Sequence, residues 1–286
     1  YGTGTIKRKA IDNTTFNISG APATKVYDGT SRYDNVSSGL TLTPKTGEIV
    51  NGDVIQFAID RTKGATFTKA DGVTATANVA DAKRVSYNIT ATGDAQTLRN
   101  YTLNGKTLDE DGLTASGEGK ITRRVLSLGL VQDEKIDKVY DGSYRLVDKE
   151  KNWNKLKDED AKGNVVYTGT NKLVNDGTSL TITSEYRNDA NTEHDKNVRG
   201  TSASPQVKDI LYHISITGGD ANNYSFDGGT SSAAGGLKLS AKGTITPKDI
   251  SNAFKPMTKV YDGGTTVNRS DVGLVSGTFI GNDSAW

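Results

Sequence analysis

The sequence predicts an all-β fold, with tandem antiparallel β-sandwich domains, Ig-like or related, in an elongated array. Three observations predict it. Apolar and polar residues alternate over long runs, which is the pattern of half-buried strands. Short segments rich in threonine and β-branched residues are bounded by Gly, Asn or Asp. Three sequence landmarks also recur in a fixed order, which indicates that one module is repeated.

The first landmark is a Lys-Val-Tyr-Asp-Gly segment that occurs three times, each a domain's length after the last. Its Asp can accept hydrogen bonds from backbone N–H groups and its Gly can take a positive φ, so we expect a turn that ends a strand. The tyrosine ring is expected to be buried, with its hydroxyl bonded to the returning backbone. A fold-defining turn is the favoured interpretation, and a ligand or catalytic site is the alternative. The motif residues are Lys25, Tyr27, Asp28, Gly29, Lys138, Tyr140, Asp141, Gly142, Lys259, Tyr261, Asp262 and Gly263.

Two further landmarks set the expected domain boundaries. A Gly-x-Ile segment recurs at 4–7, 119–122 and 243–246, and an Asn-Tyr pair precedes the last two. The pairs are Asn100 with Tyr101 and Asn223 with Tyr224. We therefore expect the last strand of a preceding repeat at 1–7, whole repeats at 8–122 and 123–246, and the partial start of a third repeat at 247–286.

Within each copy, alternation places the strands. Val85, Tyr87 and Ile89 alternate with polar residues, and so do Ile210, Tyr212, Ile214 and Ile216 in the next copy. Further strands are predicted at 39–43, 53–59, 73–79, 164–168 and 179–184. Segment 148–160 is dense in charge and is either a helix or a charged surface excursion.

Composition excludes several functional classes. The chain has no cysteine, two histidines and a net charge of +1. Thiolate zinc sites and thiol nucleophiles are excluded, and nothing attracts nucleic acid or anionic lipid to the chain as a whole. No stretch reaches the roughly 18 apolar residues of a membrane helix, and nothing resembles a signal peptide. We therefore expect a soluble mature fragment with no nucleic-acid partner and no membrane insertion.

The sequence offers few groups for catalysis or for metal binding. His194 and His213 do not recur between copies, so we expect no catalytic residue, no cofactor, no metal and no enzymatic activity. The carboxylates of 109–111 are interpreted as a solvated acidic turn, with calcium binding as the alternative. Asp94 and Asp220 follow glycines at equivalent places and are expected to shape turns rather than to hold an ion.

Together, the motifs resemble a known family. The Lys-Val-Tyr-Asp-Gly-Thr segments, followed by Asn-Tyr and then by Gly-x-Ile-Thr-Pro-Lys at 243–248, are similar to the YDG repeat domain of large secreted bacterial adhesins of the filamentous haemagglutinin type. The resemblance implies export by two-partner secretion, a location outside the cell or at the bacterial surface, and a role as stalk modules in attachment or biofilm formation. The family's motif is structural, so it transfers no catalytic residue. The proline of the last motif is replaced by Arg8 and Arg123 in the other copies.

We therefore expect a monomer whose partners are the neighbouring repeats of the same chain. The alternative function is a ligand-binding β-sandwich that recognises a glycan or host protein through its loops, with contacts from Tyr33, Trp153 and Tyr186. A further hypothesis is an internal cross-link between the motif lysines and Asn100 or Asn223.

Overall fold

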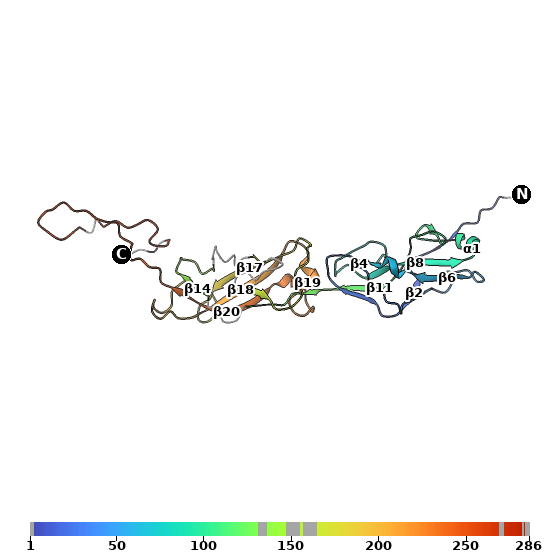
Figure 1. Ribbon diagram of the computed structural model, residues 1–286, viewed down its shortest axis with the longest axis horizontal. Helices are drawn as coiled ribbons and strands as arrows, with labels where there is room; N and C mark the ends of the chain where they lie inside the picture. The colour runs from blue at the N-terminus through green and yellow to red at the C-terminus, as the bar shows by residue number, and fades with distance from the viewer. Residues whose placement is uncertain are drawn as a thin grey trace. The chain divides into compact units, whose positions relative to one another are not determined.

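The computed structural model describes residues 3–130, 136–146, 155–156, 165–268, 272–281 and 283 (Figure 1). The described residues form mostly β-strands in several sheets with almost no helix, which confirms the all-β prediction. None of the described helices is long and apolar enough to cross a membrane.

The chain divides into two compact units. Unit 1 comprises Tyr1–Ser127, Tyr167–Ser179 and Ile216–Gly235, and unit 2 comprises Leu128–Val166, Leu180–Ser215 and Gly236–Trp286. Unit 1 thus takes in two segments that the landmarks assign to the second repeat. The repeat boundaries themselves stay a prediction.

A six-stranded sheet dominates unit 1. Its order is β3-β11-β8-β7-β4, and β6 also pairs with β8. Around the sheet, β1 pairs with β9 and β9 with β10, β2 pairs with β5, and β12 pairs with β19. The strands are β1 (Lys9–Ile11), β2 (Phe16–Ser19), β3 (Ala23–Val26), β4 (Arg32–Tyr33), β5 (Thr41–Pro44), β6 (Ile55–Ile59), β7 (Ala65–Thr68), β8 (Arg84–Gly93), β9 (Tyr101–Leu103), β10 (Lys106–Thr107), β11 (Leu113–Thr122), β12 (Arg124–Val125) and β19 (Tyr224–Ser225).

The core of unit 1 follows from the alternation along β8. Val85, Tyr87 and Ile89 point to one face and are buried, together with Phe67 from β7. Burying each such side chain contributes about 1.5–3 kcal/mol, which is why the register of this strand is fixed. The short helices η1 (Arg61–Lys63), α1 (Ala95–Arg99), η2 (Ala221–Asn223) and η3 (Ala233–Gly235) lie in connections between strands.

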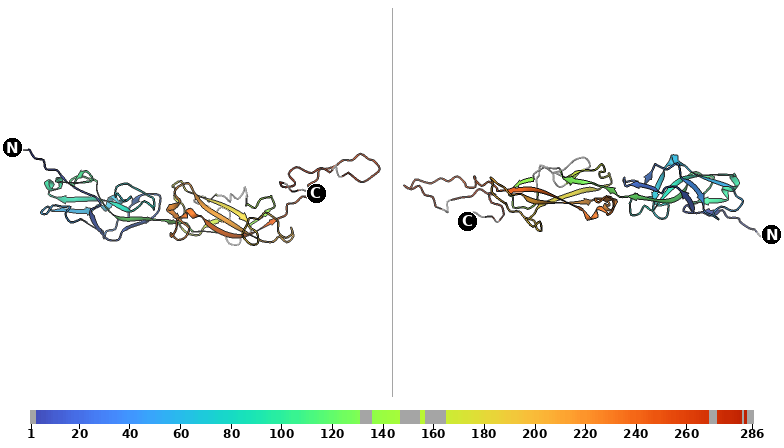
Figure 2. Two further views of the ribbon diagram at one scale, coloured as in Figure 1. Left: turned by 180° about the vertical axis from the view of Figure 1, so that it is seen from behind. Right: turned by 90° about the horizontal axis from the view of Figure 1, so that it is seen from below.

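A five-stranded sheet of order β14-β20-β18-β17-β15 forms the core of unit 2. Its yellow and orange strands run side by side in both views of Figure 2. Along β18, Ile210, Tyr212 and Ile214 are buried as predicted, whereas Ile216 is half-buried. A separate pair joins β13 to β16. The strands are β13 (Leu128–Leu130), β14 (Ile136–Val139), β15 (Lys155–Leu156), β16 (Val165–Tyr167), β17 (Ser179–Tyr186), β18 (Lys208–Thr217) and β20 (Leu237–Thr246).

Two sequence predictions fail locally. Segment 73–79 is no strand: apart from one bridge between Ala75 and Thr68 it is loop, because the Asp71 carboxylate accepts the N–H groups of Val73 and Thr74 and holds a turn there. Residues 155–156 form β15, so the helix alternative for 148–160 is wrong at these positions, and the rest of that segment lies outside the described residues. The strands predicted at 39–43, 53–59, 164–168 and 179–184 are found as β5, β6, β16 and β17.

Candidate functional site

The repeated motif builds a turn around a lysine ammonium. Lys25 Nζ donates to Asp28 Oδ1 at 2.7 Å and to the carbonyl oxygens of Thr30 at 2.6 Å and Arg32 at 2.8 Å. Asp28 Oδ1 also accepts from Thr30 N at 2.9 Å, and Gly29 takes a φ of 83°. Partial burial acts to raise the pKa of Asp28, but the hydrogen bonds from Lys25 and Thr30 outweigh it and hold this pKa below its ordinary value. The predicted strand end and Asp-Gly turn are confirmed.

The second and third copies build the same turn. Lys138 Nζ donates to Asp141 Oδ1 at 2.6 Å and to the carbonyl oxygens of Ser143 and Arg145 at 2.6 and 3.0 Å. Lys259 Nζ donates to Asp262 Oδ1 at 2.7 Å and to the carbonyl oxygens of Gly264 and Thr266 at 3.1 and 2.6 Å. A local geometry that is kept while its surroundings change is a property of the motif itself.

The tyrosine of the first turn bonds far along the chain. Tyr27 is buried, and its hydroxyl donates to Asp176 Oδ2 at 2.8 Å, across 149 residues of sequence. The expected bond to the returning backbone is therefore wrong. Tyr224 donates to the same oxygen at 2.8 Å, and the two rings meet edge to face with centroids 5.4 Å apart. Two phenols thus share one carboxylate oxygen.

Burial and the carboxylate set the protonation of this cluster. Desolvation and the hydrogen bond to Asp176 raise the pKa of Tyr27 above its ordinary value and that of Tyr224 to about 12. Burial acts to raise the pKa of Asp176, but hydrogen bonds from Thr178 and the two phenols outweigh it and lower this pKa. At neutral pH the cluster therefore consists of one carboxylate and two neutral donors, which is the arrangement that gives strong, charge-assisted hydrogen bonds.

Other side chains complete the contact around Tyr27. Asn223 is only 1% exposed; its Oδ1 accepts from Val79 N at 2.9 Å and its Nδ2 donates to Asn78 Oδ1 at 3.2 Å. Val174 lies over the turn, since a Cβ built on Gly29 would be 3.2 Å from Val174 Cγ2. We call the four residues that receive the first turn, Val174, Asp176, Asn223 and Tyr224, the tyrosine socket.

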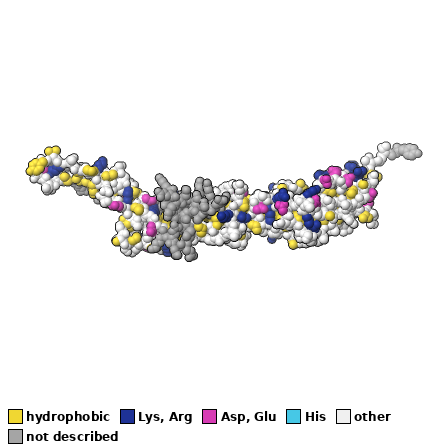
Figure 3. All heavy atoms as spheres, viewed as in Figure 1, with side chains coloured by type: hydrophobic (Ala, Val, Ile, Leu, Met, Phe, Trp, Pro, Cys, Tyr) yellow, Lys and Arg dark blue, Asp and Glu magenta, His cyan; other side chains and the backbone are white. Residues whose placement is uncertain are grey.

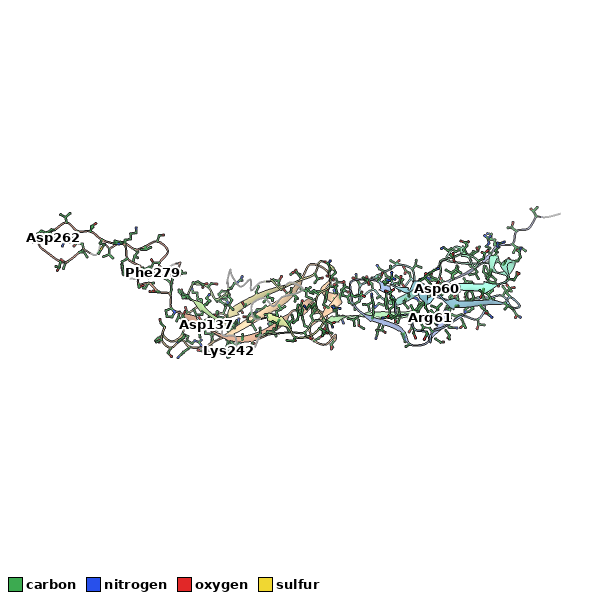
Figure 4. The ribbon with its side chains drawn as sticks, viewed as in Figure 1. Asp60, Arg61, Asp137, Lys242, Asp262 and Phe279 are labelled. Carbon is green, nitrogen blue, oxygen red and sulfur yellow. The ribbon has the colours of Figure 1, made fainter. Side chains whose placement is uncertain are left out.

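The turn of the second copy is received in a similar way within unit 2. The Tyr140 hydroxyl hydrogen-bonds the Asp283 carboxylate, and desolvation followed by this bond raises the pKa of Tyr140. A Cβ on Gly142 would clash with Ile280 Cγ2, and Gly142 takes a φ of 76°, so glycine is favoured there on both counts. In the third copy, the side chain of Asp262 is labelled in Figure 4, and the neighbouring Tyr261 is 92% exposed.

The structure places the predicted ligand contacts in different environments. Tyr186 is fully buried and its hydroxyl donates to the carbonyl oxygens of Ile136 at 2.8 Å and Thr244 at 3.1 Å, so it offers no surface to a ligand. Tyr33 is half-buried and packs edge to face on Phe67. Trp153 lies outside the described residues.

The acidic candidates act within turns. Asp94 accepts the N–H groups of Gln96 and Thr97 at the start of α1, and Asp220 caps η2, so both shape turns as predicted. In the acidic turn at 109–111, Asp109 pairs with Arg99 at 2.7 Å. Among the described residues, no group of three or more histidines and carboxylates is placed to hold a metal ion.

The contacts of the lysine and of the asparagine do not favour the hypothetical cross-link between them. The hydrogen-bond acceptors of the Lys25 ammonium all lie within residues 28–32, while the Asn223 amide bonds Asn78 and Val79.

Sequence reasoning missed Val174 and Asp176. A signal was present: Val174-Asn175-Asp176-Gly177 has a counterpart at Val50-Asn51-Gly52-Asp53 in the first copy, and Ile280 with Asp283 in the third. An apolar residue followed two or three positions later by Asp, once in each copy, would have marked it.

Comparisons of the chain with protein-family models, with curated proteins and with solved structures yield no match. An assignment of function therefore depends on the residues and their contacts.

Proposed function

We propose that this chain is a run of tandem antiparallel β-sandwich repeats that serve as an extracellular structural stalk or spacer in a bacterial surface adhesin, supporting attachment or biofilm formation. One observation carries the proposal. In the first copy the tyrosine of the recurring turn, Tyr27, is buried and shares the Asp176 carboxylate with Tyr224, and both of these partners belong to the predicted next copy. A motif that bound a ligand through its tyrosine would keep that aromatic side chain exposed.

The connection between the first two predicted copies supports a spacer role. Strand β11 ends at Thr122 and β12 begins at Arg124, so a single residue separates them. Arg124 Nε donates to Lys172 O at 2.5 Å, and a second guanidinium nitrogen donates to Tyr27 O at 3.4 Å. A connection this short and this well bonded differs from the Gly/Ser-rich linkers that let domains move freely.

The surface also suits a solvated extracellular element. Lys and Arg lie interspersed with Asp and Glu on the visible face of the chain (Figure 3), in keeping with a net charge of +1 from 35 basic and 34 acidic residues. Interspersed charges of both signs avoid a strong field of one sign, and charged strand edges discourage pairing with other chains.

Small-angle X-ray scattering of the full chain tests the spacer role. A compact globule of this length would have a radius of gyration of about 19 Å. We expect a clearly larger radius of gyration, a thin rod-like cross-section and the mass of a monomer. A radius near the compact value would refute the spacer proposal.

A further inference from the structure

The first copy carries a second set of socket residues, and none of the described residues places a Tyr-Asp-Gly turn on it. Tyr101 donates to Asp53 Oδ2 at 2.5 Å, and its hydroxyl oxygen accepts from Val50 N at 2.9 Å. In the tyrosine socket, Tyr224 makes the same two bonds, to Asp176 at 2.8 Å and from Val174 N at 3.3 Å. We call Val50, Asp53, Asn100 and Tyr101 the N-terminal socket.

The two sockets differ in what covers them. Asp176 Oδ2 accepts from two phenols, whereas among the described residues Asp53 Oδ2 accepts from Tyr101 alone. Asn223 is 1% exposed, but its counterpart Asn100 is exposed, and Val50 is 53% exposed. The N-terminal socket thus has the polar groups of the filled socket and lacks the tyrosine that covers them.

The chain enters both sockets in the same way. Before the N-terminal socket, Arg8 Nε donates to Arg99 O at 2.9 Å and Lys9 Nζ to Gly47 O at 2.6 Å. Before the tyrosine socket, Arg123 Nε donates to Asn222 O at 3.2 Å, as Arg124 does to Lys172. The entering strand pairs in parallel with the strand that follows the Asn-Tyr asparagine in both places, β1 with β9 and β12 with β19.

The isoleucine of the Gly-x-Ile segment is buried at one of two matching places and exposed at the other. Ile121 is 3% exposed because it lies in β11, paired with Lys25 of β3, the strand that leads into the first turn. Ile6 holds the matching place in Gly4-Thr5-Ile6-Lys7 and is 100% exposed. A strand like β3 beside residues 4–7 would both cover Ile6 and carry a Tyr-Asp-Gly turn toward Asp53.

We propose that the N-terminal socket binds the Tyr-Asp-Gly turn of another copy of this module. The incoming phenol shares Asp53 Oδ2 with Tyr101, and the glycine of the turn packs on Val50. This inference rests on the proposed function, because it extends the contact between successive copies to a further copy on the N-terminal side. The occupant is recognised by a phenol donor, a glycine at positive φ and a strand that pairs with residues 4–7.

A disulfide across the contact tests the proposal. A Cβ on Gly29 would lie 3.9 Å from Val174 Cβ, within the range for a disulfide, and the chain has no native cysteine. A further copy of residues 8–118 is fused directly before Gly4, with Gly29→Cys in the added copy and Val50→Cys in the original one. We expect the cross-link under mild oxidation, to the same yield as the matched pair Gly29→Cys with Val174→Cys in the unfused chain.

A mismatched pair, with Val73→Cys in place of Val50→Cys, controls for chance collisions, since Val73 is exposed elsewhere in the copy. If the matched pair of the unfused chain cross-links and the fused pair gives no more than the mismatched pair, the N-terminal socket does not bind a turn, and the proposed contact between successive copies stands. If neither matched pair cross-links, the contact on which the proposed function rests is wrong as well, and both proposals fail.

Hydrogen exchange provides a readout without cysteine. In the fused chain we expect at least about tenfold slower exchange at the backbone of 50–54 than in the original chain, because the opening of this segment becomes coupled to release of the turn. Changing the added copy's Tyr27→Phe should remove most of that protection. Equal exchange rates in the fused and original chains would overturn the proposal, whether or not the cysteine variants fold.

Discussion

Replacing Tyr27 by phenylalanine tests whether the shared carboxylate stabilises unit 1. The change removes one hydroxyl and keeps the buried ring, so packing against Tyr224 is retained. A hydrogen bond to a charged group contributes about 1.5–3 kcal/mol. Asp176 keeps its bonds from Tyr224 and from Thr178 N, so it is not left without partners, and we expect a loss of about 2 kcal/mol.

Urea unfolding followed by circular dichroism measures this loss. The midpoint should fall while the slope with urea stays unchanged, because the variant exposes the same surface on unfolding. Tyr261→Phe is the matched control: it removes the same hydroxyl from the third turn, where the side chain is 92% exposed, and should change the free energy of unfolding by less than about 0.5 kcal/mol. Equal effects of the two variants would refute the reasoning about the tyrosine socket.

Three further predictions concern the turns and their pH dependence. Because burial raises the pKa of Tyr224 to about 12, the folded state holds its proton more tightly than the unfolded state, so stability should be full below about pH 10 and fall toward pH 12 in alkaline unfolding curves. Lys25→Met removes an ammonium that donates to four acceptor atoms and should lower the free energy of unfolding by about 1–3 kcal/mol, against almost no change for the exposed Lys63→Met. Gly142 and Gly263 both have a positive φ, which is unfavourable for alanine, but only Gly142→Ala also places a methyl group against an isoleucine side chain. In thermal melts Gly142→Ala should therefore lower the free energy of unfolding by about 1–3 kcal/mol more than Gly263→Ala.

Local signals in the sequence were sufficient for strand β8 and for the turn. The alternation of Val85, Tyr87 and Ile89 predicts a half-buried strand, and β8 has these three side chains in its core. The Asp-Gly pair predicts the turn because both requirements, a carboxylate acceptor and a residue tolerant of positive φ, are met within a few residues. Such features depend on neighbours in the sequence, so a single chain reveals them.

The partner of Tyr27 could not be predicted in the same way. Asp176 lies 149 residues away, and its carboxylate resembles any other acidic residue in a loop. Only the recurrence of a similar Asp near Val50 and near Ile280 distinguishes it. The prediction of a strand at 73–79 was wrong for a local reason. The residues of this segment favour a strand, but the Asp71 carboxylate accepts backbone N–H groups there and holds a turn.

The chemistry of the tyrosine socket has a consequence for where such a module can work. Disulfides open in reducing surroundings, calcium clamps release when the ion is scarce, and histidine pairs change charge in mildly acidic fluid. A carboxylate of lowered pKa bound to phenols of raised pKa does none of these, because Asp176 stays ionised and Tyr27 and Tyr224 stay neutral over the whole interval between their pKa values. The hydrogen bonds from the two phenols to this carboxylate therefore keep their strength when the redox conditions, the metal-ion concentration or the pH change within that interval.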